Sequence, residues 1–201
     1  MHRYRSPLGS DKLKEKILDA AEGRFLTYGY SKTTMAEIAT DSDMSAANLY
    51  RYFQSKQDIA AECAERCMSK QHNDISETVH QGNLSASQQL HVFATETYRT
   101  NANLYKENFK INGLVDYILK ERKALVHKGI NSQCSLIAEI LAYGNKTGEF
   151  HIIDIIETAR TIYSALILFD VPLFLDLFTE EEFEKKATNI VHLLIEGLKK
   201  R

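Results

Sequence analysis

Residues 33–56 read TTMAEIATDSDMSAANLYRYFQSK, and they contain two short helical patterns separated by a polar turn. The second pattern opens with small and hydroxyl-bearing side chains and ends in a crowded LYRYF. A buried helix would not favour this composition, because each hydroxyl and amide needs a hydrogen-bond partner once it leaves water. A surface that enters the narrow space between phosphate groups would favour it, since small residues let the backbone approach closely.

Capping signals mark where the helices of this segment begin. Thr34 and Glu37 have the spacing of a capping box, in which the Thr hydroxyl and the Glu carboxylate each accept a hydrogen bond from an otherwise unpaired backbone N–H. This box predicts a short helix that ends near Thr40. Ser45 can cap a second helix that continues to about Phe53.

The residues before this segment predict a longer helix. From Asp11 onwards apolar residues recur at helical spacing, and Gly29 is placed to end the helix. One long and two short helices form a three-helix unit that contains a helix-turn-helix. The apolar residues that we expect in its core are Ile17, Phe25, Ile38, Met44, Leu49 and Phe53.

The composition of the whole chain is that of a globular protein rich in helices. It has 201 residues, of which 44% are hydrophobic and 26% are charged, with only two prolines and nine glycines. The formal net charge of −2 gives no overall attraction to nucleic acid, so DNA binding would need a local site. No signal peptide and no long apolar run occur, and the three cysteines have no disulfide framework, so we predict a cytoplasmic protein.

Helical patterns continue to the end of the chain, and no stretch has a convincing strand pattern. We therefore predict an all-α fold of about nine helices. Residues 143–150, YGNKTGEF, predict a break before two strongly amphipathic final helices. We place a helix-turn-helix domain at residues 1–55, with a flexible arm at 1–10, and a larger helical domain at 56–201.

Side chains suited to reading DNA cluster at the start of the second short helix. A helix-turn-helix lays its second helix in the major groove with its N-terminal residues toward the base edges. Asn48 can form two hydrogen bonds to an adenine edge, and Arg51 can reach guanine or a phosphate. The other residues that we expect to allow close approach or to bind phosphates are Thr33, Thr34, Ser45, Ala46, Ala47, Tyr50, Tyr52 and Lys56.

The helix-turn-helix pattern by itself leaves a second interpretation open, because helical hairpins with polar turns are common. Residues 1–60 contain nine Lys and Arg against eight Asp and Glu, so the charge of this region adds little to DNA affinity. Arg3 and Arg5 in the arm can contact the minor groove, or the arm has no function. The alternative function is a helical small-molecule-binding or scaffold protein that does not read DNA.

The sequence KEKILDAAEGRFLTYGYSKTTMAEIATDSDMSAANLYRYFQSKQDI closely resembles the DNA-binding region of the TetR family of bacterial transcription regulators. The long first helix ending in YGY, the TTM that opens the second helix and the block MSAANLYRYFQSK have the order and spacing of that family. Asp43 departs from the family pattern, which usually has glycine in this turn, but aspartate tolerates left-handed backbone better than most residues. The resemblance implies DNA contacts by Thr34, Ser45, Asn48, Tyr50, Arg51, Tyr52 and Lys56.

The same resemblance implies a homodimeric regulator, in most cases a ligand-responsive repressor, that binds a palindromic operator. Its ligand-binding and dimerisation domain, here residues 56–201, would dimerise through the last two helices. Independently, the apolar faces of these helices exceed what a thin bundle needs, although they can also pack inside one protomer. The predicted interface residues are Ile155, Ala159, Ile162, Leu166, Phe169, Phe183, Ala187, Ile190, Leu194 and Leu198.

A ligand site has a weaker signal, carried by aromatic residues on the middle helices. These residues can line a pocket for an apolar or aromatic small-molecule effector, or they can be ordinary core residues. They are Tyr98, Phe109, Tyr117, His127 and Tyr143.

Metal and catalytic chemistry are not predicted. Cys63 and Cys67 share a helix face but lack a third ligand, so we expect buried thiols at these positions rather than a metal site, and a redox role for these two or for Cys134 has no support. The sequence contains no phosphate-binding glycine loop, no zinc-protease motif and no nucleophile elbow. We therefore predict neither an enzyme nor a cofactor.

Overall fold

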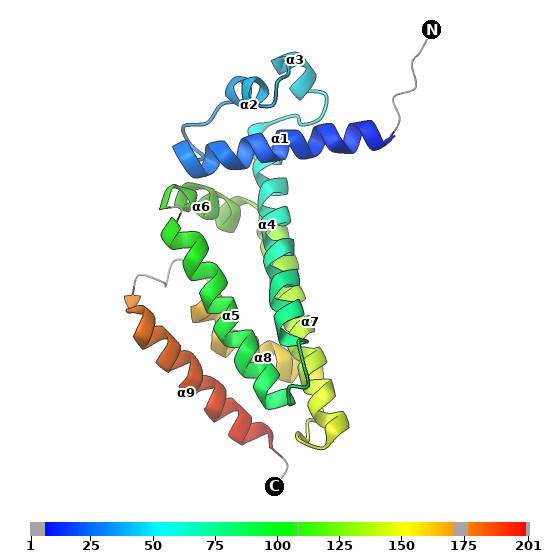
Figure 1. The fold of residues 1–201 in the computed structure, drawn as a ribbon, viewed down its shortest axis with the longest axis vertical. Coiled ribbons are helices and arrows are strands. Elements are labelled where there is room, and N and C mark those ends of the chain that lie inside the picture. Colours follow the sequence, from blue (N-terminus) through cyan, green and yellow to red (C-terminus); the bar gives the residue numbers. More distant parts are fainter. Residues whose placement is uncertain (1–6, 108, 171–176, 200–201) are drawn as a thin grey trace. The chain divides into compact units, whose positions relative to one another are not determined.

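A computed structural model describes residues 7–107, 109–170 and 177–199, and this part of the chain is almost entirely helical (Figure 1). Its elements are α1 (Pro7–Tyr28), α2 (Met35–Asp41), α3 (Ala46–Leu49), α4 (Lys56–Val79), α5 (Ala86–Glu107), the 3-10 turn η1 (Phe109–Ile111), α6 (Asn112–Glu121), α7 (Lys123–Thr147), α8 (Ile155–Asp170) and α9 (Glu180–Leu198). Over the same residues the only β pairing is an isolated bridge between Phe150 and Lys199. The predicted all-α fold is confirmed. None of the described helices is long and apolar enough to cross a membrane.

The start of α1 differs from the prediction. The helix begins at Pro7, inside the segment predicted as a flexible arm. Proline is compatible with a first helical position, because the N–H that it lacks would have no partner within the helix. Arg3 and Arg5 of the predicted arm lie outside the described residues.

Two further helix ends also differ. The α3 helix ends at Leu49 rather than near Phe53, because the next residues tighten into turns such as the one closed by Arg51 N–H donating to Asn48 O over 3.1 Å. The α7 helix continues to Thr147, so the predicted break at residues 143–150 is shorter than expected. The chain then turns at Gly148, whose φ of 77° favours glycine.

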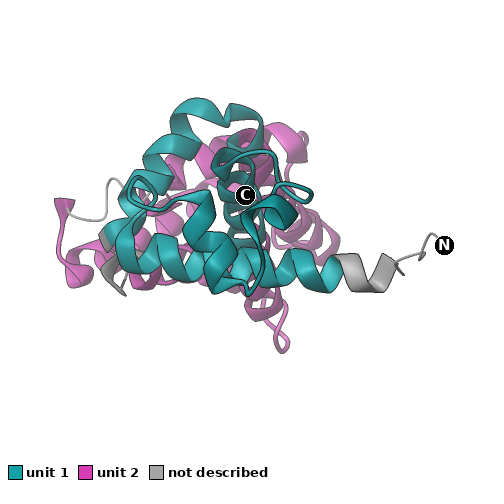
Figure 2. Ribbon diagram, turned by 90° about the horizontal axis from the view of Figure 1, so that it is seen from above, with its two compact units in different colours: residues 1–68, 108–126 teal, residues 69–107, 127–201 magenta. Residues whose placement is uncertain are grey.

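The helices form two compact units, shown in different colours in Figure 2. The first unit contains residues 1–68 and 108–126, and the second contains residues 69–107 and 127–201. The division falls within α4, and it joins α6 to the helix-turn-helix in one unit.

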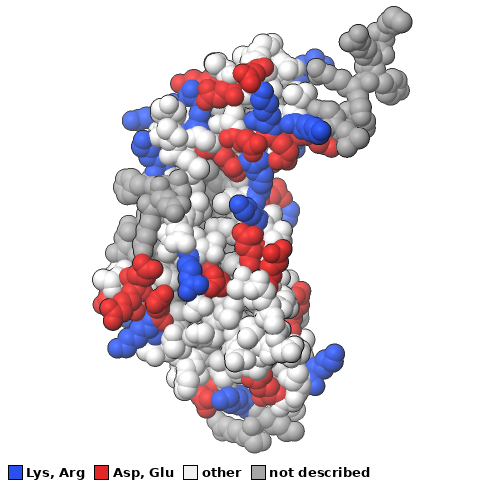
Figure 3. Space-filling model, in the orientation of Figure 1, with Lys and Arg blue, Asp and Glu red and all other residues white. Residues whose placement is uncertain are grey.

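The core of the first unit joins its three N-terminal helices to the start of α4. Five of the six predicted core residues are buried, and Met44 is half-buried. Arg66 of α4 also pairs with three carboxylates of α1, at N–O distances of 2.8 Å to Glu15, 2.8 Å to Asp19 and 2.5 Å to Glu22. In the view of Figure 3, Lys and Arg side chains lie among Asp and Glu side chains over the upper part, and much of the lower half is uncharged.

The second unit has its own core, in which α5 packs against α8 and α9. Three aromatic rings lie at its centre: Tyr98 stacks on Phe183 with centroids 5.0 Å apart, and Phe169 meets Phe183 edge to face at 5.9 Å. Such pairs add roughly 0.5–1.5 kcal/mol each to the free energy of burial. This cluster ties one residue from each of the three helices together.

Candidate DNA-binding interface

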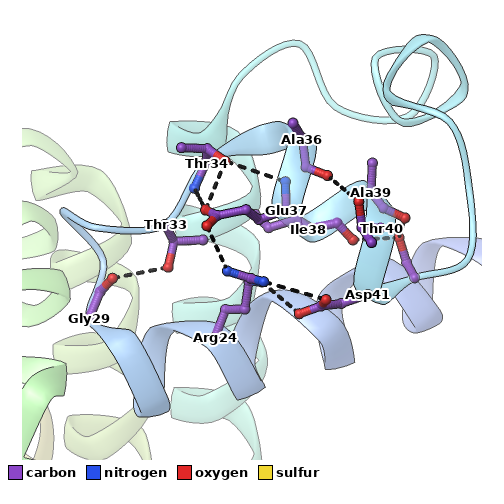
Figure 4. Close-up of polar contacts among 11 residues, drawn as sticks. Arg24, Gly29, Thr33, Thr34, Ala36, Glu37, Ile38, Ala39, Thr40 and Asp41 are labelled. Carbon is purple, nitrogen blue, oxygen red and sulfur yellow. Dashed lines mark hydrogen bonds and ion pairs between the residues drawn. The ribbon is translucent and has the colours of Figure 1, made fainter.

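The α2 helix opens with the capping box predicted from the sequence (Figure 4). Thr34 N–H and Thr34 Oγ1 each donate to Glu37 Oε2 over 2.8 Å, and Glu37 N–H donates to Thr34 Oγ1 over 3.3 Å. These bonds from Thr34 hold the pKa of Glu37 below its usual value, because they favour the carboxylate. Arg24 of α1 lies 3.2 Å from Glu37 and 2.6 Å from Asp41, so α1 holds both ends of this helix.

The turn between α2 and α3 places Asp43 in left-handed backbone with a φ of 54°. Asp43 Oδ2 accepts a hydrogen bond from Lys16 Nζ over 2.7 Å, and this bond lowers the pKa of Asp43. Met44 N–H then donates to Ala39 O over 2.9 Å and closes the turn. The tight turn expected at this position is therefore present with aspartate in place of glycine.

The α3 helix presents a small and polar surface to solvent. Ser45 caps the helix by accepting a hydrogen bond from Asn48 N–H over 3.2 Å. Leu49 and Phe53 are buried and hold α3 against the core of the first unit. Of the predicted contact residues, Thr34, Ser45, Ala46, Ala47, Tyr50 and Arg51 are exposed, and Asn48, Tyr52 and Lys56 are half-buried.

Thr33 does not belong to this surface. Its side chain is buried, and its Oγ1 donates to Gly29 O over 3.0 Å (Figure 4). The hydroxyl therefore ends the turn after α1 and cannot reach a phosphate. This burial removes the Thr33 side chain from the predicted contact set.

Lys56 has a structural role that the sequence did not indicate. Its Nζ donates to Tyr30 O and to Thr33 O over 2.8 Å each, and it lies 4.5 Å from the centroid of the Tyr30 ring. Partial burial lowers the pKa of this ammonium group, since desolvation disfavours the charged form. Two of the three N–H donors of Lys56 are thus used within the chain, which leaves one for another partner.

Most cations near α2 and α3 are paired within the first unit. Lys16 and Arg24 bind carboxylates of the helix-turn-helix, as described above, and Lys14 pairs with Glu62. Arg51 differs, because it is exposed and has no ionic partner among the described residues. Arg51, in the turn directly after α3, is therefore a cation that is available to an anion.

The predicted pocket residues do not line one described cavity. Tyr98 is buried in the aromatic cluster of the second unit, and Tyr117 belongs to the first unit, where its ring stacks on Tyr30. His127 is exposed, and Tyr143 is 40% exposed at the edge of a shallow depression near Gly148. The side chain of Phe109 lies outside the described residues.

A set of polar side chains in the second unit was not predicted from the sequence: Tyr163, Asn101, Thr97 and Gln133 are buried, and Asp170 is half-buried. Asp170 Oδ2 accepts from Tyr163 OH over 2.5 Å, and Asp170 Oδ1 accepts from Asn101 Nδ2 over 3.1 Å. Thr97 Oγ1 and Gln133 Oε1 are buried without a hydrogen-bond partner among the described residues. The available signal was the presence of Thr97 and Asn101 one turn apart on the core face of α5, where apolar residues are usual.

The predicted dimer residues divide into two sets. The first set is buried within its own chain: Ala159, Ile162, Leu166, Phe169, Phe183 and Ala187. The second set is half-buried: Ile155, Ile190, Leu194 and Leu198. The first set packs inside one protomer and is not available to a partner, whereas α8 and α9 leave other apolar residues exposed, namely Ile156, Ile167 and Leu193.

Cys63 is buried as predicted, whereas Cys67, also predicted to be buried, is half-buried. Burial raises the pKa of Cys63 to about 12, which opposes formation of the reactive thiolate. Burial also raises the pKa of Cys134. No group of three metal-ligating side chains occurs in the part of the chain that the structure describes.

Two known family descriptions match the chain. "Bacterial regulatory proteins, tetR family" matches residues 17–63, and "Tetracyclin repressor-like, C-terminal domain" matches residues 86–191. The second match alone spans more than half of the 201 residues. The chain therefore belongs to the TetR family of bacterial regulatory proteins, which agrees with the predictions that it has this ancestry and is not an enzyme.

Curated relatives resemble the N-terminal part of the chain. The HTH-type transcriptional regulator QacR of Staphylococcus aureus is 42% identical over 50 residues, which are 25% of this chain and 27% of QacR. The negative transcriptional regulator IcaR of the biofilm operon icaADBC, from the same organism, is 33% identical over 73 residues, or 36% of this chain and 39% of IcaR. The chain thus matches well under half of the length of either relative.

Solved structures share the whole fold. A transcriptional regulator from Cytophaga hutchinsonii superposes with a TM-score of 0.73 at 22% identity, covering 92% of this chain and 98% of that one. Thermus thermophilus FadR, a TetR family repressor solved with lauroyl-CoA, has a TM-score of 0.66 at 18% identity, covering 94% and 96%. At these identities the likeness shows the fold alone.

Proposed function

We propose that this protein is a DNA-binding transcriptional regulator that reads duplex DNA with α3. The observation that carries the proposal is the exposed, small-residue start of this helix at Ser45, Ala46 and Ala47, supported from behind by the buried Leu49 and Phe53. Such a surface can approach the base edges of the major groove closely. Family membership supports the same function, and its site of action would be the chromosome in the bacterial cytoplasm.

The side chains around this surface suggest a division of roles. Asn48 and Arg51 have the chemistry to read base edges, and the phenolic groups of Tyr50 and Tyr52 suit phosphate oxygens. Lys56 would bind a phosphate with its remaining N–H donor. The hydroxyl of Thr34 would have to exchange Glu37 for a phosphate in order to contribute a hydrogen bond.

The regulator would act as a homodimer on a palindromic operator. Two recognition helices bind successive major grooves when they lie roughly 34–36 Å apart or at a near multiple. We assign the interface to the exposed face of α8 and α9, because Ile156 is 57% and Leu193 76% exposed. Exposed apolar side chains on neighbouring helices are typical of surfaces that a partner covers.

We further propose that a small-molecule effector controls this repressor. An effector can bind more tightly to a dimer whose recognition helices have a different spacing. It then lowers the DNA affinity by the difference between its binding free energies for the two dimer states, about 1–3 kcal/mol. The interior of the second unit is the proposed site: its aromatic cluster suits an apolar or aromatic molecule. The unpaired oxygens of Thr97 and Gln133 would accept a hydrogen bond from such a molecule.

The alternative function, a helical small-molecule-binding or scaffold protein, has less support. It is supported by Asp43 in place of the usual glycine and by the nearly balanced charge of residues 1–60. The turn at Asp43 nevertheless has the required left-handed backbone, and Arg51 is exposed directly after α3.

The proposal is tested by selecting duplexes from a random library with the full-length protein. We expect enrichment of a palindrome, whose affinity can then be measured by fluorescence anisotropy over a salt series. Arg51→Ala and Asn48→Ala should each relax preference at particular base pairs by about 1–3 kcal/mol. Lys56→Ala should lower the affinity for all duplex sequences alike. Circular dichroism checks that each variant is folded.

Two outcomes would count against this assignment. A uniform loss of affinity in all three variants would exclude base reading by Asn48 and Arg51. No enrichment of any duplex would favour the alternative function.

A further inference from the structure

Helix α6 lies in the same compact unit as the helix-turn-helix, although residues 69–107 of the other unit separate them in sequence (Figure 2). The 3-10 turn before α6 contacts the end of α1, where Lys110 Nζ donates to Thr27 O. Gly29, which follows α1, is beside the same residue, since a Cβ added there would be in van der Waals contact with Lys110 O at 3.7 Å. The segment 108–126 is thus in direct contact with the element that precedes α2.

Four side chains extend this contact toward α2, and we name them the Tyr30 cluster: Tyr30, Lys56, Tyr117 and Arg122. The rings of Tyr117 and Tyr30 are stacked, with centroids 5.0 Å apart and 24° between their planes. Arg122 Nε donates to Tyr117 OH over 3.0 Å, while its Nη2 donates to Asp58 Oδ1 over 3.2 Å. Arg122, the C-cap of α6, therefore holds the Tyr117 side chain through its hydroxyl and links it to Asp58 of α4.

The other end of the cluster reaches the candidate DNA interface. Lys56 lies against the Tyr30 ring and donates to the carbonyls of Tyr30 and Thr33. These carbonyls belong to the turn that leads directly into Thr34, the N-cap of α2. The position of the Tyr30 ring therefore affects both the ammonium group of Lys56 and the turn that leads into Thr34, the N-cap of α2.

We propose that Tyr117 and Arg122 of the α6 segment are positioning residues for DNA binding. Tyr117 holds the Tyr30 ring, and Tyr30 in turn holds Lys56 and the turn before Thr34 in the geometry that meets the DNA backbone. Neither residue touches DNA. This inference rests on the proposed DNA-binding function and adds to it a fourth element, α6, outside the helix-turn-helix.

The cluster lies beside the buried core of the first unit, and the Tyr30 ring meets the core residue Phe25 edge to face with centroids 5.6 Å apart. Tyr30, Tyr117 and Arg122 are half-buried at the edge of the unit, whereas Ile17, Phe25 and the other core residues are buried. Removing the Tyr117 ring would leave that core packed. The variant is therefore expected to fold, and its DNA affinity can be measured.

The experiment uses the full-length protein and the duplex that the wild type enriches from a random library. Tyr117→Leu removes the stacked ring, Tyr117→Phe keeps the ring without its hydroxyl, and Arg122→Gln removes the guanidinium group. Lys120→Gln is the matched control, since Lys120 is an exposed cation of α6 that pairs with Asp116. The readouts are the Kd, the thermal midpoint and hydrogen exchange at the amides of residues 30–38.

We expect Tyr117→Leu to weaken binding by about 3- to 10-fold, a change in line with loss of one aromatic pair. Hydrogen exchange in residues 30–38 should be faster in this variant. Tyr117→Phe and Arg122→Gln should each show a smaller loss, because each removes the bond between Arg122 Nε and Tyr117 OH but keeps the stacked ring, and Lys120→Gln should show none. In a Lys56→Ala background the loss from Tyr117→Leu should shrink, because the two residues act through the same ring.

A purely structural role makes a different prediction. Tyr117→Leu would then lower only the thermal midpoint, with unchanged Kd and unchanged exchange in the folded protein, and the inference would be overturned. Equal losses in Tyr117→Phe and Tyr117→Leu would also overturn it, because the ring would not be the cause. If the wild type enriches no duplex, the proposed function fails first, which is a distinguishable result.

Discussion

Asp43 stands at a turn position with a φ of 54°, where a side chain costs most residues about 1–2 kcal/mol. Its carboxylate is held by Lys16 of α1, so the residue both makes the turn and joins it to the first helix. Asp43 also places a negative charge beside the surface proposed to meet phosphates, and it neutralises a lysine that could otherwise attract them. The same side chain thus stabilises the turn and weakens the local positive field.

Replacing Asp43 separates these two effects. The free energy of unfolding of Asp43→Ala should be about 1 kcal/mol lower than that of Asp43→Gly, because glycine adopts this backbone without strain and alanine does not. Asp43→Gly should bind DNA about two- to fivefold more tightly than the wild type at low salt, and the gain should shrink as salt rises. Urea denaturation and anisotropy titrations measure the two quantities, and equal affinities of Asp43→Gly and the wild type at low salt would contradict the electrostatic part.

At the scale of elements, two helices begin with the same capping box. In α9, Thr179 N–H donates to Glu182 Oε2 over 2.8 Å and Glu182 N–H donates to Thr179 Oγ1 over 3.3 Å, which matches the distances at Thr34 and Glu37 in α2. The two boxes are in different units. They therefore provide a comparison in which the local chemistry is constant and only the proposed function differs.

Thr34→Ala and Thr179→Ala should each lower the free energy of unfolding by about 1 kcal/mol, because each leaves a helix N–H without its partner. Only Thr34→Ala should also weaken DNA binding. Denaturant titration and anisotropy test both statements. A matching loss of DNA affinity in Thr179→Ala would mean that the effect is one of stability alone.

The capping carboxylates also predict how stability responds to acid. Hydrogen bonds from Thr34 and Thr179 hold the pKa values of Glu37 and Glu182 below their ordinary value of 4.5. The stability that they contribute is present above that pH and is lost as pH falls through the lowered native values, because the unfolded chain takes up protons first. Urea midpoints between pH 6 and pH 3 should fall less steeply for a Glu37→Gln, Glu182→Gln double variant than for the wild type.

Two glycines within helices should respond to alanine in opposite ways. A Cβ at Gly144 of α7 would lie 2.1 Å from a ring carbon of Phe150, whereas a Cβ at Gly23 of α1 would meet nothing within 4 Å. Gly144→Ala should therefore destabilise the protein by about 1–3 kcal/mol through overpacking. Gly23→Ala should stabilise it by up to about 1 kcal/mol, since alanine favours helix. Thermal melts of the two variants should shift in opposite directions.

At the scale of the whole molecule, each unit has its own core, and the second unit leaves an apolar surface uncovered. Phe169 and Phe183 complete the inner faces of α8 and α9, so their contribution is already used within one protomer. Ile156 and Leu193 remain exposed on the same helices. A two-fold partner would cover such a surface with its own copy.

The double variant Ile156→Lys, Leu193→Lys should therefore be monomeric at micromolar concentration. Buried lysines would face their own symmetry copies and repel. Leu119→Lys is the control, because Leu119 is an exposed leucine of α6 in the first unit. Sedimentation velocity distinguishes the species, and a monomeric wild type would rule out the proposed interface.

The sequence by itself determined where α2 and α3 begin and that the fold is all helical. Capping boxes, Ser45 and the glycine at position 29 act through bonds between residues at most four positions apart, so their effect can be read from spacing. The same locality explains why the left-handed turn at Asp43 and the exposed start of α3 could be anticipated. The resemblance of the N-terminal motifs to the TetR family predicts the overall architecture.

Tertiary structure alone decided which partners these helices find. Lys56 binds carbonyls 23 and 26 residues away, and Tyr117 stacks on the ring of Tyr30 in the turn after α1 rather than lining a pocket. Thr33 and the inner faces of α8 and α9 became buried for the same reason. Helical periodicity shows which face of a helix is apolar. Several helices of this chain have such a face, so periodicity does not tell which faces pack together. Only the folded chain selects which of them meet, because that choice depends on packing between residues far apart in sequence.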